Sequence, residues 1–210
     1  PAEPQAYLIQ ATVDISPEAT GSAKSFLDTI TANAQSVVAS STVATELRQG
    51  AEGSIVVQAA ETCEQLEGAL RAAACPDELS ASDCNVIVSS CGDASSSRRR
   101  GRSRSLQSAT EAFIVSRTLA AADTLSAPVV DAAILASELQ TTVTVQQPAV
   151  TSYVAQMNIV ALGDTSAAVS SQETFSSSIS TLNSQLAVAT GNDVTLFSVN
   201  QPVAILPPAP

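Results

Sequence analysis

The chain has 210 residues, a formal net charge of −11 and a hydrophobic fraction of 45%, so it is long enough for one large or two small folded domains. It contains no His and no Trp, and Lys24 is its only lysine, which excludes histidine acid–base chemistry, histidine metal sites and Ser-His-Asp triads. Aromatic residues make up 3% of the chain, so an aromatic-walled ligand pocket is not expected. No catalytic residue, cofactor site or metal site can be named from this composition.

The first half of the chain predicts four strands and two helices in the order β-α-β-β-α-β. Each helix has apolar residues recurring on one face, and the turn sequences SPEATG and RQGAEG separate neighbouring elements. The glycines of RQGAEG favour a hairpin between two strands. The strands are predicted at residues 7–15, 43–47, 54–59 and 84–89. The apolar stripes of the helices are Phe26, Leu27, Ile30, Ala34, Val37 and Val38 in one, and Cys63, Leu66, Leu70 and Ala73 or Ala74 in the other.

The second half repeats this order. One helix is predicted over residues 129–139, and a second carries Phe175, Ile179, Leu182 and Leu186 on one face. The sequence QQPAVTS is interpreted as the connection between the two middle strands. The strands are predicted at residues 112–119, 143–145, 153–162 and 194–199.

The repeated order β-α-β-β-α-β is that of the ferredoxin-like split βαβ fold. The sequence therefore predicts an α+β protein made of two tandem two-layer sandwiches, each with an antiparallel sheet covered on one face by two helices. The alternative is a single larger α+β domain with the same elements rearranged. The predicted divisions are a Pro-rich arm at 1–5, a disulfide-stapled module at 6–93, a Ser/Arg-rich linker at 94–108, a second module at 109–203 and a Pro-rich arm at 204–210.

All four cysteines lie in the first predicted module, at positions 63, 75, 84 and 91. The spacings lack the close CxxC pairs of zinc sites, so a disulfide framework is favoured. Cys63 and Cys75 would stand at opposite ends of one helix, roughly 18 Å apart, which is too far for a disulfide. Cys84 and Cys91 are parted in the same way along a strand. A helix running antiparallel to the next strand then selects Cys75–Cys84 and Cys63–Cys91.

The segment Gly53-Ser54-Ile55-Val56-Val57 resembles the GSVVV signature of SEA domains, which are extracellular modules with this same order of elements. In self-cleaving members of that family, the serine hydroxyl attacks the preceding carbonyl. The resemblance implies Gly53–Ser54 as a candidate self-cleavage bond. The alternative is a hairpin that leads into a buried strand.

Five of the nine basic residues form one run, Arg98, Arg99, Arg100, Arg102 and Arg104. Without them the remaining charge would be −16, which would repel nucleic acid, and the run lacks interleaved aromatic residues, so no nucleic-acid partner is expected. The R-x-x-R pattern makes Arg99, Arg102 and Arg104 candidate processing positions for a secretory-pathway convertase. The alternative is a solvated, mobile linker that contacts an acidic neighbour.

Both predicted arms are rich in proline, which favours extended polyproline II structure. Modules rich in Ala, Ser and Thr, an Arg-rich interruption and Pro-rich spacers make the chain similar to green-algal surface glycoproteins, such as cell-wall and mastigoneme proteins. In that group prolines are hydroxylated and glycosylated. The resemblance implies O-linked sugars at the candidate positions Pro1, Pro4, Pro207, Pro208 and Pro210.

These features predict a secreted, non-enzymatic subunit or repeat unit of an extracellular fibril or cell wall, either a mature protein or an excerpt of a longer chain. It would polymerise with copies of itself through its arms and sheet edges, and a heterologous contact would leave the array open. No apolar run reaches the roughly 18 residues that span a bilayer, so no membrane insertion is expected in this segment. Two alternatives are a SEA-like adhesion or receptor module and a secreted enzyme that uses Asp and Glu.

Overall fold

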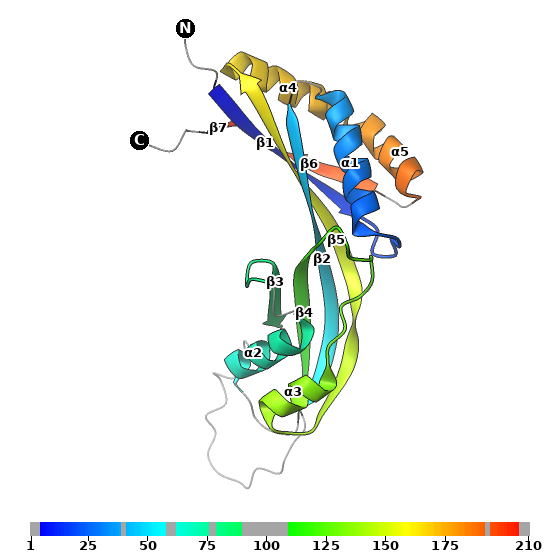
Figure 1. Cartoon of the computed structure of the whole chain (residues 1–210), viewed down its shortest axis with the longest axis vertical. Helices are drawn as coiled ribbons and strands as arrows, with labels where there is room; N and C mark the ends of the chain where they lie inside the picture. Colours follow the sequence, from blue (N-terminus) through cyan, green and yellow to red (C-terminus); the bar gives the residue numbers. More distant parts are fainter. Residues whose placement is uncertain are drawn as a thin grey trace. The chain divides into compact units, whose positions relative to one another are not determined.

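The computed structural model describes residues 5–38, 41–57, 62–75, 79–89, 109–191 and 194–205 and shows an α+β protein with an antiparallel sheet (Figure 1). Its elements follow one another as β1 (Gln5–Ile15), α1 (Ala23–Val37), β2 (Thr42–Val57), α2 (Cys63–Ala74), β3 (Cys84–Val88), β4 (Ala109–Leu119), α3 (Ala132–Leu139), β5 (Val143–Gly163), α4 (Thr165–Ser177), α5 (Ile179–Thr190), β6 (Val194–Val199) and β7 (Val203–Ile205).

The described residues divide into two compact units. Unit 1 draws on Pro1–Arg48, Leu119–Leu125 and Ser152–Pro210, and unit 2 draws on Gln49–Thr118 and Ser126–Thr151. The strand order is β2-β5-β1-β6 in unit 1, with β7 also paired to β1, and β3-β4-β2-β5 in unit 2. Both β2 and β5 therefore contribute one part of their length to each unit.

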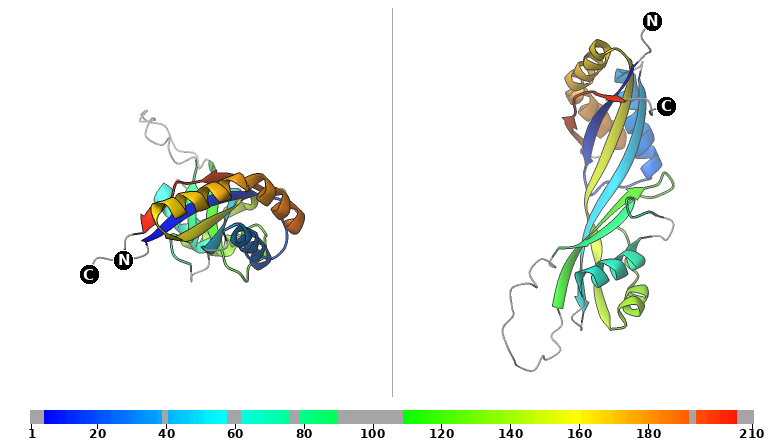
Figure 2. Two further views of the ribbon diagram at one scale, coloured as in Figure 1. Left: turned by 90° about the horizontal axis from the view of Figure 1, so that it is seen from above. Right: turned by 90° about the vertical axis from the view of Figure 1, so that its left-hand side faces the viewer.

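Unit 1 buries one face of its sheet beneath α1, α4 and α5 (Figures 1 and 2). Alternate residues of β1 from Tyr7 to Ile15 are buried, as the period of two along a strand requires. Phe26 and Ile30 of α1, which lie four residues apart on one helix face, are buried as well. The side chain of Ser22 caps α1 by accepting a hydrogen bond from the Ser25 amide.

Unit 2 packs α2 and α3 against one face of its four-stranded sheet. Phe113 and Leu135 are fully buried in this core. Helix α2 begins with a capping box between Thr62 and Gln65, and α3 begins at Asp131, whose carboxylate accepts from two backbone amides. These local signals explain why both helices start where the structure has them.

Two predicted hairpins are wrong, because β2 and β5 are single continuous strands. The sequence RQGAEG lies inside β2, where the lack of a side chain at Gly53 leaves space for the Phe113 ring. QQPAVTS lies inside β5, with Pro148 buried. The single helix predicted over the stripe from Phe175 to Leu186 is also two helices, α4 and α5, divided at Ser178.

The tandem ferredoxin-like arrangement is not confirmed. Strands from the first half of the chain (β1, β2 and β3) alternate in the sheet with strands from the second half (β4, β5 and β6). The pairing of β1 with β5 runs from Gln5 opposite Gly163 to Ile15 opposite Tyr153, so it joins residues far apart in sequence. Short-range periodicity does not encode such pairings.

The two ends of the described chain form strands. Gln5, assigned to the first Pro-rich arm, begins β1, and Val203–Ile205, which overlaps the second arm, forms β7. Ala6 stands opposite Ile205 in the antiparallel β1–β7 pair. Among the helices that the structure describes, none is long and apolar enough to cross a membrane.

Candidate interaction surface

The structure places a disulfide between Cys75 and Cys84, with the Cα atoms 5.9 Å apart. It joins the end of α2 to the start of β3, which is the helix-end-to-strand-start contact expected from the sequence. Cys63 opens α2, while Cys91, its predicted partner, lies outside the described residues. The end of α2 is therefore covalently held against the sheet of unit 2.

Gly53 and Ser54 lie inside β2. The φ angle of Gly53 is not in the positive range, and the Ser54 hydroxyl donates to Oε1 of Gln146 on β5 at 3.0 Å. This is ordinary extended backbone with an engaged serine hydroxyl. The self-cleavage hypothesis for the Gly53–Ser54 bond stays a prediction.

The other predicted site residues lie outside the described part of the chain. They are the arginines 98, 99, 100, 102 and 104 and the prolines 1, 4, 207, 208 and 210. The processing and glycosylation hypotheses stay predictions.

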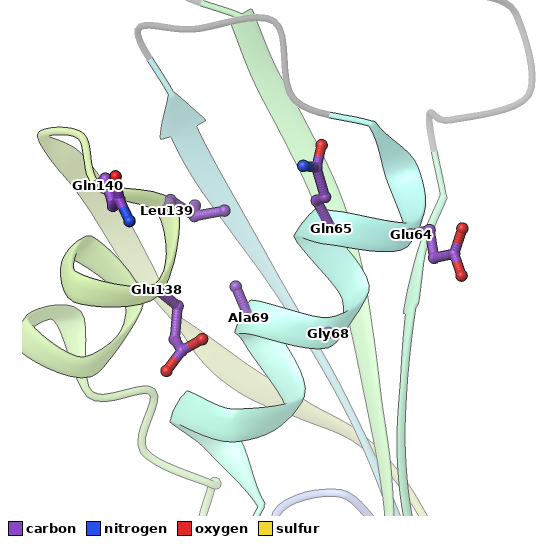
Figure 3. Close-up of a pocket in the computed structure, with 7 residues that line it drawn as sticks. All are labelled: Glu64, Gln65, Gly68, Ala69, Glu138, Leu139 and Gln140. Carbon is purple, nitrogen blue, oxygen red and sulfur yellow. The ribbon is translucent and has the colours of Figure 1, made fainter.

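An open groove between α2 and α3 has a volume of about 520 Å³ and carries two carboxylates, Glu64 and Glu138 (Figure 3). Figure 3 shows Glu138 extending toward α2, whereas Glu64 is directed away from α3. Both side chains are exposed. The carboxylates therefore do not converge on a common point, as a cooperating general acid and general base would.

The more distinctive surface is the open face of the sheet in unit 1. Its residues come from three neighbouring strands, since Ala6 pairs with Leu162 on one side and Ile205 on the other. Residues directly opposite each other in antiparallel strands point to the same face. The next row on that face is Val160, Leu8 and Val203. We call this set the apolar face: Ala6, Leu8, Val160, Leu162, Val203 and Ile205.

Three members of the apolar face are strongly exposed: Leu162 by 66%, Val203 by 63% and Ile205 by 44%. The face ends at a polar row, where the Gln10 amide donates to Oδ1 of Asn158 at 3.1 Å. It contains no charged residue, although the chain as a whole carries a net charge of −11. A neutral apolar patch rimmed by polar side chains is typical of an interaction surface.

The apolar character of this face could have been predicted from the sequence, but not from a pattern in which apolar and polar residues alternate. Residues 7–9 and 159–162 are apolar at every position, and a continuous apolar run indicates a strand with two apolar faces. The contribution of β7 had no such signal, because its residues stand among prolines.

Comparison of the chain with protein-family models, with curated proteins and with solved structures gives no significant match.

Proposed function

We propose that this chain is a non-catalytic structural subunit of an extracellular assembly, and that it associates with a second copy of itself through the apolar face. The observation that carries the proposal is the exposure of Leu162, Val203 and Ile205 on one continuous sheet surface. Burying apolar side chains against their counterparts is the dominant driving force of protein association.

Electrostatics favour this surface for contact between copies. Molecules with a net charge of −11 repel one another, so they associate most readily where neither copy presents a charge. The apolar face meets that condition. A contact between two identical faces is isologous and closes at a dimer, so growth of a fibril would need a second surface, for which the predicted Pro-rich arms and sheet edges are candidates.

The extracellular location is supported by the Cys75–Cys84 disulfide, because disulfides persist mainly in oxidising compartments. In the proposed assembly the chain is a secreted glycoprotein with O-linked sugars on its prolines. It carries out no reaction of its own.

A finer assignment of the fold supports a scaffold role. We infer two nested ferredoxin-like modules: β1-α1-β2 with β5-α4-α5-β6 in unit 1, and β2-α2-β3 with β4-α3-β5 in unit 2. In each inferred module, the first and third strands along the chain would lie in the middle of the sheet, and the second and fourth would lie at its edges. This is the strand order of the split βαβ fold. Each module would keep one sheet face free of its own helices and available for a neighbour.

The test is the oligomeric state of the double variant L162S/V203S, measured by sedimentation velocity over a range of concentrations. We expect the unchanged chain to form dimers or larger species and the double variant to be monomeric. The control is Val188→Ser, because Val188 is 86% exposed on α5, outside the apolar face. Equal association of the wild type and the double variant would overturn the proposal, as would a monomeric wild type at high concentration.

A further inference from the structure

Unit 2 contains a second hollow, of about 520 Å³, between the last turn of α2 and the segment that leads into α3. Small residues form most of its walls, together with Ile134: alanines 72–74, Cys75 and the segment 126–129. Val129 is 75% exposed and Ile134 is 43% exposed, so both side chains have free apolar surface. Arg117 is the charged residue among those that line it.

Arg117 is placed in this hollow by its position on β4. Phe113 and Val115 belong to the core that packs beneath α2 and α3, and Arg117 lies two residues after Val115, so it points to the same face of the strand. Its side chain is half-buried. A cation at a core position must be stabilised by specific partners, since burial without them is costly.

The partners of Arg117 within the described residues are neutral. Its Nε donates to Oε1 of Gln49 at 2.7 Å, and its Nη2 donates to the Ser126 carbonyl at 3.3 Å. Gln49, which is 1% exposed, also donates from Nε2 to the Ser126 carbonyl at 2.7 Å. Two neutral acceptors orient the guanidinium without cancelling its charge, and no carboxylate among the described residues forms an ion pair with it.

The walls of the hollow are fixed before any ligand arrives. The Asp131 amide donates to the Ala73 carbonyl at 2.9 Å, which ties α2 to the start of α3. The disulfide at Cys75 holds the end of α2 to Cys84, which stands opposite Arg117 in the β3–β4 pair. A site whose walls and cation are already oriented loses little freedom on binding.

From this arrangement we propose that the hollow over Arg117 is a binding site for a small carboxylate that carries a short apolar group. The guanidinium offers N–H groups in a planar fork that matches a carboxylate, and the alanines, Val129 and Ile134 would cover the apolar group. A guanidinium that forms no ion pair with a carboxylate among the described residues attracts an anion to this hollow on a chain whose net charge is −11. The proposal is independent of self-association through the apolar face.

The experiment is a titration of the full chain with butyrate and hexanoate, followed by amide chemical shifts in two-dimensional NMR. Hexanamide is the neutral control ligand. We expect shifts confined to residues 72–75, 117 and 126–134, tighter binding of hexanoate than of butyrate, and no response to hexanamide. In Arg117→Gln, hexanoate should bind at least about tenfold more weakly, because a charge-assisted hydrogen bond is lost. Arg117→Lys should fall between the two, since it keeps the charge without the fork.

Arg48→Gln is the matched control, because Arg48 is an exposed arginine in unit 1 that pairs with Glu46. Unchanged hexanoate binding in R48Q, together with its loss in R117Q at unaltered thermal stability, would support the site. Binding that is equal for hexanamide, or equal in R117Q, would overturn it.

A further variant tests the role of Asp77 and Glu78, which follow the lining residue Cys75 in the sequence. The double variant D77N/E78Q should bind hexanoate at least as tightly as the unchanged chain does. Binding seen only in the double variant would mean that the chain's own carboxylates occupy Arg117, and would overturn an external ligand.

Discussion

At the scale of single residues, Gly53 shows how one missing side chain allows a strand to continue. A Cβ atom at this position would lie 2.6 Å from Cζ of Phe113 and 3.0 Å from the Gln146 carbonyl oxygen. Phe113 is fully buried in the core of unit 2. The glycine therefore serves close packing between β2, β4 and β5, where the sequence had indicated a turn.

We predict that Gly53→Ala destabilises the chain by about 1–3 kcal/mol, since the Phe113 ring must shift within a packed core. Urea unfolding, monitored by circular dichroism, measures the change. Gly68→Ala is the matched control: Gly68 lies inside α2 with open space where an added methyl group would lie, so alanine there should stabilise by about 0.5–1 kcal/mol. A G53A variant as stable as the wild type would contradict this account of the packing.

The Gly53–Ser54 bond should stay intact in the purified protein. The bond lies inside the extended strand β2, and the Ser54 hydroxyl donates to Gln146 rather than to a base that could activate it. Mass spectrometry of the denatured chain should give one full-length species, and Ser54→Ala should give the same result. Fragments that begin at Ser54 in the wild type and vanish in S54A would instead establish self-cleavage.

The two residues that orient the proposed carboxylate site could have been found in the sequence. Arg117 follows Phe113 and Val115 at steps of two, and Gln49 follows Leu47 in the same way. A polar side chain at a core position of an alternating strand is a sign of a buried hydrogen-bond network. Their mutual contact could not be predicted, because 68 residues separate them in the chain.

At the scale of elements, α3 depends on its N-terminal cap. Oδ1 of Asp131 accepts from the amides of Ala133 at 2.8 Å and Ile134 at 3.2 Å. Asp131→Ala should cost about 1 kcal/mol of unfolding free energy. Glu138→Ala, an exposed change within the same helix, should leave stability nearly unchanged. Equal effects of the two substitutions in urea unfolding would show that the cap contributes nothing.

Most helices were predictable, and the lengths of the strands were not. The stripe from Cys63 to Ala74 coincides with α2, because an amphipathic period and a capping box are local properties. The glycines of RQGAEG and Pro148 are turn formers in isolation, yet they continue β2 and β5. Pairing with neighbouring strands overrode local propensity there, and that pairing depends on residues far away in sequence.

At the scale of the whole molecule, each compact unit contains strands from both halves of the chain. A protease site inserted between Gly101 and Arg102 tests this directly. After cleavage there, we expect the two fragments to stay together under native conditions, because hydrogen-bonded strand pairs such as β1–β5 join them. Size-exclusion chromatography with light scattering should report the mass of the uncut chain.

Tandem modules would behave differently, since a cut in the predicted linker at 94–108 would release two separate particles. All four cysteines precede the cut, so no disulfide can hold the fragments together. Denaturant without a reducing agent should therefore separate them. Release of two folded fragments in native buffer would contradict the alternating strand order.

The β1–β7 pair has a mechanical consequence. Ala6 stands opposite Ile205, so the chain enters and leaves unit 1 at the same end of two antiparallel strands. Tension applied through both ends would pull β7 away from β1 one rung at a time, as a zipper opens, because the ladder bonds lie across the strands. In a filament joined through these ends, the proline-rich segments would carry the pulling force once β7 has separated from β1. The rest of unit 1 would then lie outside the path of the force.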